Sequence, residues 1–222
     1  MSFGTEPPAP VVNDNPIVHE EYWQGSKRFY ICFAGIRGGV GMSQLDFSRS
    51  AGILDSSRIF LRDPNTAWYQ HGLPGIGENI HDIARFLERK IEQSGASEVR
   101  FFGNCMGGYA AILCCALIGR GRAVAFAPQT GVISSDERHH LTSRLFDQQK
   151  PEHIYNLAEW LGHNAPDVQA DIHVARDYDL DVAHAKALEG FRNIRIHYYE
   201  KGGHRVIIHA HQLGLLKGIM AQ

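Results

Sequence analysis

A cysteine in a glycine-rich turn is the residue of this chain best suited to covalent chemistry. Cys105 lies in the sequence GNCMGG (residues 103–108), which follows an apolar segment and precedes an apolar helical segment at residues 109–118. This strand–turn–helix layout is typical of a nucleophile elbow, although serine usually holds the central position. Gly103 and Gly107 leave room in a turn where a Cβ would clash. The N-terminus of the following helix would favour a thiolate.

A cysteine nucleophile needs a base, an acid that orients the base, and donors for the oxyanion. His204 follows two glycines directly after the last predicted strand, so the turn could bring its imidazole over the sheet toward Cys105. The acid is expected in the loop after the preceding strand, which offers three carboxylates. Asp179, in mid-loop, is the first choice and Asp177 the alternative. Asp181 is interpreted as the N-cap of the next helix.

The oxyanion donors are expected to be backbone N–H groups. One belongs to Met106, directly after the nucleophile, and the other to Ile36 in the loop after the first core strand. That loop reads GIRGG (residues 35–39) and could instead suggest a dinucleotide-binding turn. Its spacing departs from G-x-G-x-x-G at the second glycine, which disfavours that alternative.

Neither a metal site nor a cofactor is predicted. Three histidines near the C-terminus could suggest a metal site, but His209 and His211 are two apart on a predicted helix and face different directions. The remaining cysteines lie within predicted strands or helices, form no disulfide or metal-binding pattern, and are expected to be buried: Cys32, Cys114 and Cys115.

Strand and helix signals alternate along the chain, which predicts a mostly parallel sheet with helices on both faces. The predicted strands are residues 28–34, 58–61, 98–102, 123–127, 172–175 and 194–199. The predicted helices are residues 78–93, 109–118, 182–188 and 206–220. The stretch 134–167 has a polar helical pattern. It could form a small cap over the site or ordinary surface helices, and the sequence leaves both open.

The 222 residues are expected to form a single domain over residues 28–222. Residues 1–27 are expected to be a flexible N-terminal arm, because the first fifteen are rich in proline and acidic residues and lack the apolar core of a signal peptide. A net charge of −2 argues against nucleic-acid and anionic-membrane partners. No apolar run is long enough to span a bilayer, so the expected location is the cytoplasm.

With these motifs, the chain resembles the α/β-hydrolase superfamily from Arg28 to the C-terminus. The order nucleophile, acid, histidine (105, 179, 204) matches the Ser…Asp…His order of that fold. The resemblance implies the α/β-hydrolase fold, with helices on both faces of a mostly parallel sheet. Residues 62–64 and 68–69 (RDP and WY) further resemble hydrolase domains found with polysaccharide-biosynthesis proteins, which usually carry serine.

Cysteine at the elbow is similar to dienelactone hydrolases and, more closely, to aminoacyl shuttle transferases of nonribosomal peptide pathways such as those of coronamic acid and syringomycin. The resemblance implies acyl or aminoacyl transfer through a Cys–His–Asp triad, from a thioester and by way of an acyl-S-enzyme. It also implies phosphopantetheinylated carrier proteins as partners. Two alternatives stay open: a hydrolase of small esters, lactones or thioesters with the same triad, and a non-catalytic ligand-binding protein.

Overall fold

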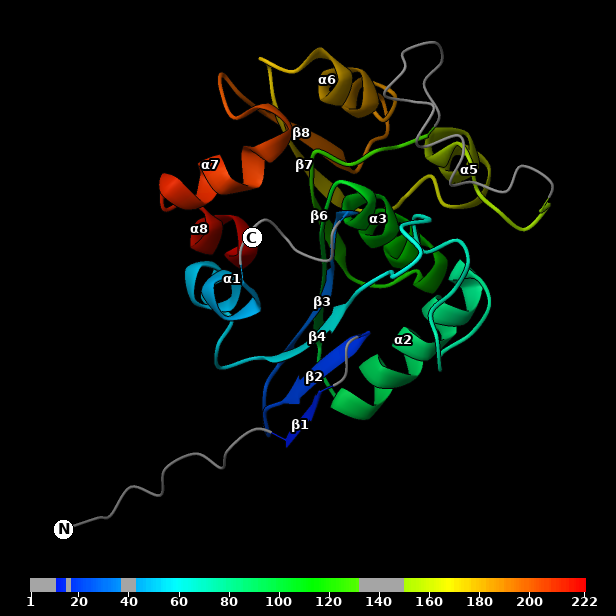
Figure 1. Cartoon of the computed structure of the whole chain (residues 1–222), viewed down its shortest axis with the longest axis vertical. Coiled ribbons are helices and arrows are strands. Elements are labelled where there is room, and N and C mark those ends of the chain that lie inside the picture. Colours follow the sequence, from blue (N-terminus) through cyan, green and yellow to red (C-terminus); the bar gives the residue numbers. More distant parts are fainter. Residues whose placement is uncertain (1–10, 15–16, 37–42, 132–149) are drawn as a thin grey trace.

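The computed structural model describes residues 11–14, 17–36, 43–131 and 150–222, in which a central sheet is flanked by helices on both faces (Figure 1). The described strands form one eight-stranded sheet in the order β1-β2-β4-β3-β5-β6-β7-β8. Their bounds are β1 Val11–Asp14, β2 Val18–Tyr22, β3 Arg28–Phe33, β4 Ser57–Leu61, β5 Glu98–Asn104, β6 Arg122–Phe126, β7 Ala170–Ala175 and β8 Ile194–Tyr199. The pairs from β4 to β8 are parallel, whereas β1–β2 and β2–β4 are antiparallel.

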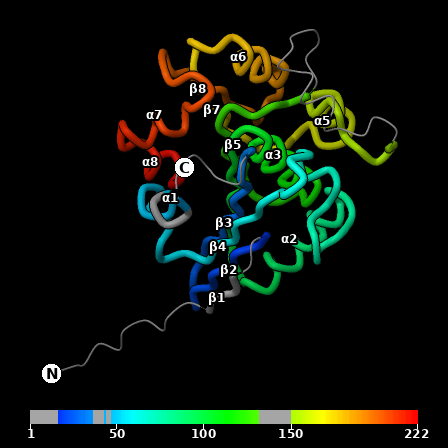
Figure 2. Tube along the Cα trace, viewed as in Figure 1, coloured from blue at the N-terminus to red at the C-terminus, as the bar shows by residue number. Residues whose placement is uncertain are grey.

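The helices divide between the two faces of the sheet. Their bounds are α1 Gln44–Ala51, α2 Ile80–Ser94, α3 Met106–Ile118, α5 Leu157–Asn164, α6 Asp179–Lys186, α7 Val206–Gln212 and α8 Leu216–Ala221. Helices α2, α3, α5 and α6 contribute buried residues to one core, and α1, α7 and α8 to the other. In the trace, α8 returns beside α1 (Figure 2).

Alternation along the strands separates the two cores. Phe101 and Phe102 are neighbours on β5, both are fully buried, and each belongs to a different core. Successive side chains of a strand point to opposite faces, so a strand covered on both sides is a continuous apolar run. This explains why the central strands could be predicted from their composition: each of the six predicted strands is found within two residues of its predicted bounds.

The expectation of a flexible arm over residues 1–27 is wrong for the two segments that form β1 and β2. β2 pairs with β4 and extends the sheet by antiparallel strands. Val18 is buried on this strand, and the Lys27 carbonyl accepts the backbone N–H of Glu98 at 2.9 Å. The pairing of β2 with β4 satisfies backbone groups that β4 would otherwise leave unpaired at the sheet edge.

The closing helix predicted over residues 206–220 is two helices, α7 and α8. Gly214 between them has a positive φ of 68°, a conformation that glycine adopts without strain. The break allows α8 to turn back against α1.

The described part of the stretch 134–167 contains α5. The buried Leu157 and Leu161 of this helix belong to the core. Residues 132–149 lie outside the described part of the chain, so the cap stays a prediction.

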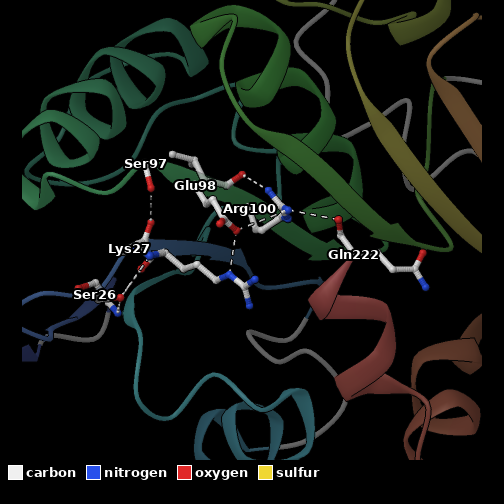
Figure 3. A network of polar contacts seen from close by, with 9 residues as sticks. Ser26, Lys27, Ser97, Glu98, Arg100 and Gln222 are labelled. Carbon is white, nitrogen blue, oxygen red and sulfur yellow. Dashed lines mark hydrogen bonds and ion pairs between the residues drawn. The ribbon is translucent and has the colours of Figure 1, made fainter.

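Figure 3 shows how the C-terminal end of the chain is joined to the start of β5. Arg100 donates to the Gln222 carbonyl at 3.3 Å, and its guanidinium lies 3.9 Å from the Glu98 carboxylate. Glu98 also pairs with Arg28 of β3 at 2.8 Å. These contacts hold α8 against the N-terminal ends of the strands. The carboxyl end of β5, at the opposite edge of the sheet, carries the elbow.

Candidate active site

The turn between β5 and α3 has the geometry of a nucleophile elbow. Cys105 holds φ 57° and ψ −123°, a backbone conformation that is strained for any residue except glycine. A Cβ on Gly103 would lie 2.0 Å from the Gly107 carbonyl oxygen, and a Cβ on Gly107 would lie 2.3 Å from the Phe33 carbonyl oxygen. The prediction that a Cβ at either position would clash in this turn is therefore confirmed.

Gly107→Ala is expected to destabilise the fold by at least about 2 kcal/mol, because the carbonyl groups of Phe33 and Ala34 must shift to admit a methyl group. The measurement is the free energy of unfolding from urea titration. Gly162→Ala is the matched control: this glycine lies on α5 with no atom within 4 Å of the added Cβ. The free energy of unfolding of Gly162→Ala should exceed that of the native protein by about 0.5–1 kcal/mol. Equal stabilities for the two variants would contradict this account of the elbow.

The imidazole of His204 links the elbow to a carboxylate. His204 lies in a short 3₁₀ helix, Gly203–Arg205, directly after β8. Its Nδ1 is 2.9 and 3.0 Å from the two carboxylate oxygens of Asp181. His204 also interacts with Cys105, and this interaction contributes to the raised pKa of the imidazole. Since Nδ1 is engaged by Asp181, Nε2 is the ring nitrogen that faces the sulfur.

The acid beside His204 is Asp181, so the choice of Asp179 was wrong. Helix α6 begins at Asp179, three residues earlier than predicted, and Tyr178 rather than Asp181 is the N-cap. Asp181 consequently lies inside the first turn, where it is only 1% exposed, whereas Asp179 is exposed. The N-cap preference of aspartate was a weaker determinant here than the tertiary contact with the histidine.

Asp177, the alternative acid, contacts the histidine-bearing turn instead of the imidazole. Its carboxylate accepts the backbone N–H groups of Gly202 at 3.2 Å and Gly203 at 2.9 Å. Both glycines have positive φ, 134° and 53°, so the turn needs residues without a Cβ. Asp177 thereby ties the loop after β7 to the loop after β8 and fixes where His204 emerges.

Hydrogen bonding decides the protonation of this pair. Burial alone would lower the pKa of His204, but the hydrogen bonds with Asp181 and Cys105 outweigh it and raise the pKa to about 10. Burial raises the pKa of the Asp181 carboxyl, although its hydrogen bond with His204 opposes the change. The raised pKa makes His204 a strong acceptor for the proton of the Cys105 thiol, and the Asp181 carboxylate stabilises the imidazolium that forms.

The raised pKa of His204 makes stability depend on pH. A histidine whose pKa rises from 6.5 in the unfolded chain to about 10 in the fold stabilises the fold fully below pH 6.5. That contribution is lost as the pH rises through 10. We expect the free energy of unfolding of the native protein to exceed that of His204→Gln most at pH 6, and the difference to shrink toward pH 10. A difference that stays constant over this range in urea titrations would contradict the assignment.

The end of β3 lies directly against the elbow. A Cβ on Gly35 would lie 3.5 Å from the Cβ of Cys105 and 2.9 Å from the Asn104 carbonyl oxygen. Ile36, which follows, is 43% exposed. Met106 begins α3, and the first N–H groups of a helix have no partner within it. The expected oxyanion donors thus come from segments that meet at Cys105, while residues 37–42 of the loop lie outside the described residues.

The segment that resembles polysaccharide-associated hydrolases braces this strand end. Asp63 is 2% exposed and accepts the backbone N–H groups of Asn65, Ala67 and Tyr69 at 2.9, 2.7 and 2.9 Å. The Tyr69 hydroxyl donates to the Ala34 carbonyl at 2.9 Å. The aspartate and the tyrosine therefore hold the loop after β4 against the residues that lead into the expected oxyanion loop.

Gln129 is a further side chain at the site, and no local motif in the sequence predicts it. The Oε1 atom of Gln129 accepts the thiol of Cys105, with a distance of 3.5 Å to Sγ. Gln129 lies in the loop after β6, beyond Ala127, which has a positive φ of 43°. Strand topology could have pointed to Gln129. β6 neighbours β5, and the carboxyl ends of neighbouring parallel strands meet at the same edge of the sheet.

Metal-ligating residues do not gather at this site. Within the described part of the chain, no three His, Cys, Asp or Glu side chains are placed to hold a metal ion. Over the same residues, no helix is long and apolar enough to cross a membrane. The chemistry available at the site is that of a thiol, an imidazole and a carboxylate.

Comparison with solved structures decides the fold. The α/β hydrolase MGS-MChE2, from the metagenome of lagoon sediments of Mar Chica, Morocco, matches with a TM-score of 0.60 and 13% identity, over 91% of this chain and 93% of that chain. The chain has the α/β-hydrolase fold. Carboxyl esterase 2 of the fungus Tuber melanosporum matches this α/β-hydrolase domain with a TM-score of 0.61 and 11% identity, over 99% and 88% of the two chains.

A third structure with the α/β-hydrolase fold is the capsule O-acetyltransferase of Neisseria meningitidis serogroup A. It matches with a TM-score of 0.62 and 14% identity, over 95% of this chain and 94% of that chain. No family model and no curated protein matches the sequence. At such identities the likeness establishes the α/β-hydrolase fold, and the function must be argued from the side chains of the site.

Proposed function

We propose that this protein catalyses covalent acyl transfer through Cys105, with a thioester as substrate and an acyl-S-enzyme as intermediate. The observation that carries the proposal is the hydrogen-bonded pair of His204 and Asp181 beside the elbow that carries Cys105. The three residues follow β5, β8 and β7, so the fold brings together groups from three separate segments of the chain. A nucleophile, a base and an orienting acid in this relation are the components of nucleophilic acyl chemistry.

The reaction balances with these groups alone. The proton of the Cys105 thiol passes to His204 as the sulfur bonds to the thioester carbonyl carbon. The carbonyl oxygen then carries the negative charge, which backbone N–H groups of Met106 and Ile36 would stabilise. When the oxyanion collapses, the bond to the donor sulfur breaks and His204 protonates the departing thiolate. A second thiol reverses these steps and leaves with the acyl group.

Cysteine suits transfer better than serine does. An acyl group that moves from a carrier thioester to Cys105 exchanges one thioester for another, so the step is close to isoenergetic and reversible. A serine would form the more stable oxygen ester, for which hydrolysis is the usual exit. The natural donors and acceptors in this proposal are coenzyme A or phosphopantetheinylated carrier proteins. The likeness to an O-acetyltransferase supports transfer as chemistry that the fold accommodates.

Hydrolysis of small esters, lactones or thioesters by the same residues is the second candidate. It is favoured by the likeness to a carboxyl esterase and by the exposure of the His204 side chain, 35%, which gives water access to the base. A third candidate, binding without turnover, predicts no covalent intermediate.

The fate of the acyl group separates these candidates. The protein is incubated with butyryl-coenzyme A, with and without N-acetylcysteamine as the second thiol, and the products are separated by chromatography. Transfer predicts butyryl-N-acetylcysteamine as the main product when the thiol is present, and little free acid when it is absent. Free acid at equal rates in both incubations would establish a hydrolase. Neither product above the level of Cys105→Ala would refute both catalytic candidates.

A further inference from the structure

Two loops flank Cys105 from opposite sides. In the sheet, β5 lies between β3 and β6. The loop after β3 brings Gly35 against the elbow, and the loop after β6 brings Gln129 to the sulfur. The carbonyl oxygen of a bound acyl group belongs on the β3 side, where Ile36 is the expected donor. The substituent on the acyl group therefore extends toward the other side, where the Gln129 carboxamide stands.

Gln129 is held in place from several directions. Its backbone N–H donates to the Cys105 carbonyl at 3.4 Å. The next residue, Thr130, donates its N–H to His184 Nδ1 at 3.1 Å and its hydroxyl to the His184 carbonyl at 3.1 Å. His184 is 1% exposed and lies on α6, the helix that also supplies Asp181. One helix thus positions both the acid beside His204 and the loop that carries Gln129, so the backbone of Gln129 is fixed before substrate arrives.

Acylation removes the hydrogen-bond donor of Gln129. In the free protein, the Cys105 thiol donates to the Gln129 Oε1 atom. In the acyl-enzyme, the sulfur has no proton, and the Oε1 atom faces the first atoms of the acyl group. A polar group left without a partner in a half-buried site weakens binding of any acyl group that cannot replace the lost donor.

We propose that Gln129 selects acyl groups that carry a hydroxyl on the carbon next to the thioester carbonyl. This inference rests on the proposed acyl transfer and names its substrate class. A hydroxyl oxygen at that carbon lies three bonds from the sulfur, within reach of a carboxamide 3.5 Å from the same atom. The carboxamide oxygen of Gln129 is a neutral acceptor, which suits the neutral hydroxyl of such an acyl group as donor. An ammonium at this carbon would instead lie close to His204, which is positively charged while it holds the proton taken from Cys105.

The test compares three N-acetylcysteamine thioesters that differ at one position: lactyl, alanyl and propionyl. The measured quantity is kcat/KM for release of N-acetylcysteamine. It is compared as a ratio between substrates within each variant, so that a change in the reactivity of Cys105 common to all substrates cancels. The native protein should prefer lactyl over propionyl by about 5- to 100-fold, the cost of leaving the Gln129 acceptor unpaired, and should prefer lactyl over alanyl.

Gln129→Met removes the acceptor at similar volume and should bring the lactyl-to-propionyl ratio to within about threefold of one. Gln129→Glu supplies a carboxylate and should raise the alanyl-to-lactyl ratio at least about tenfold. Gln93→Met, the same change at an exposed position on α2, is the control and should keep the native ratios.

Two results would overturn the role of Gln129 alone: a native protein that reacts equally with lactyl and propionyl thioesters, or a Gln129→Met variant that keeps the native ratio. A native protein that releases N-acetylcysteamine from none of the three would overturn the proposed acyl transfer and the role of Gln129 with it.

Discussion

Cys105→Ser is expected to load an acyl group about 10²- to 10⁴-fold more slowly than the native protein and to retain it when a second thiol is added. The alcohol is a far weaker nucleophile than a thiolate at neutral pH. The product is an oxygen ester, from which transfer back to a thiol is unfavourable. Loading is measured by intact mass after timed exposure to butyryl-coenzyme A, and release by mass after addition of N-acetylcysteamine.

Cys105→Ala should show no loading while keeping a stability within about 1 kcal/mol of the native protein, since only one buried sulfur atom is removed. Cys115→Ala is the matched control, because this cysteine is also buried and burial raises the pKa of its thiol to about 12. That variant should load like the native protein. Rapid and complete passage of the acyl group by Cys105→Ser would refute the thioester-exchange argument.

Asp181→Asn should lower the rate of loading by about 10²- to 10⁴-fold, whereas Asp179→Asn should leave it within about twofold of native. The Asp181 carboxylate holds the His204 imidazole through Nδ1 and stabilises its protonated form, and an amide cannot do the latter. Asp179 is two residues away on the same helix and exposed, which makes it a matched control. The measurement is single-turnover loading of Cys105.

A larger loss of loading rate in Asp179→Asn than in Asp181→Asn would identify Asp179 as the acid. That result would contradict the pairing of His204 with Asp181 as the functional one. Equal, small losses in both variants would show that Cys105 and His204 act without a third residue. Circular dichroism of both variants serves to exclude misfolding, since Asp181 is buried and its replacement leaves a buried polar group.

The nucleophile and the histidine could be predicted from the sequence because local glycines mark them. Gly103 and Gly107 stand where a Cβ would meet backbone within 2.3 Å, and the two glycines before His204 both hold positive φ. These constraints act over a few residues and leave a pattern in the sequence. The central strands were predictable for a similar reason, since burial on both faces makes them continuous apolar runs.

The acid could not be predicted, because its identity depends on where α6 begins. An aspartate before an apolar stretch indicates an N-cap, yet α6 begins at Asp179 with Tyr178 as N-cap, and no side chain caps it. The contact between Asp181 and His204 spans two loops and overrides the local preference. Gln129 escaped prediction because its role follows from the adjacency of β5 and β6 and from no local motif.

Charged residues obscure the strand pattern of β2 in the sequence. Glu20 of β2 is 3% exposed and pairs with Lys90 of α2 at 2.9 Å, while Glu21 pairs with the buried Arg58 of β4. Both carboxylates are paired with partners far along the chain, so the acidic residues of β2 do not mark a solvated segment. The pairing becomes visible only once β2 is placed beside β4.

The central claim is that Cys105 forms the acyl-enzyme. Its most direct test is to quench the native protein seconds after mixing with butyryl-coenzyme A, and to locate the added mass by peptide mapping. We expect one butyryl group per chain, on the peptide that contains Cys105, and none on Cys105→Ala. A native protein that releases free acid without any adduct on Cys105, or an adduct on another residue that persists in Cys105→Ala, would contradict it.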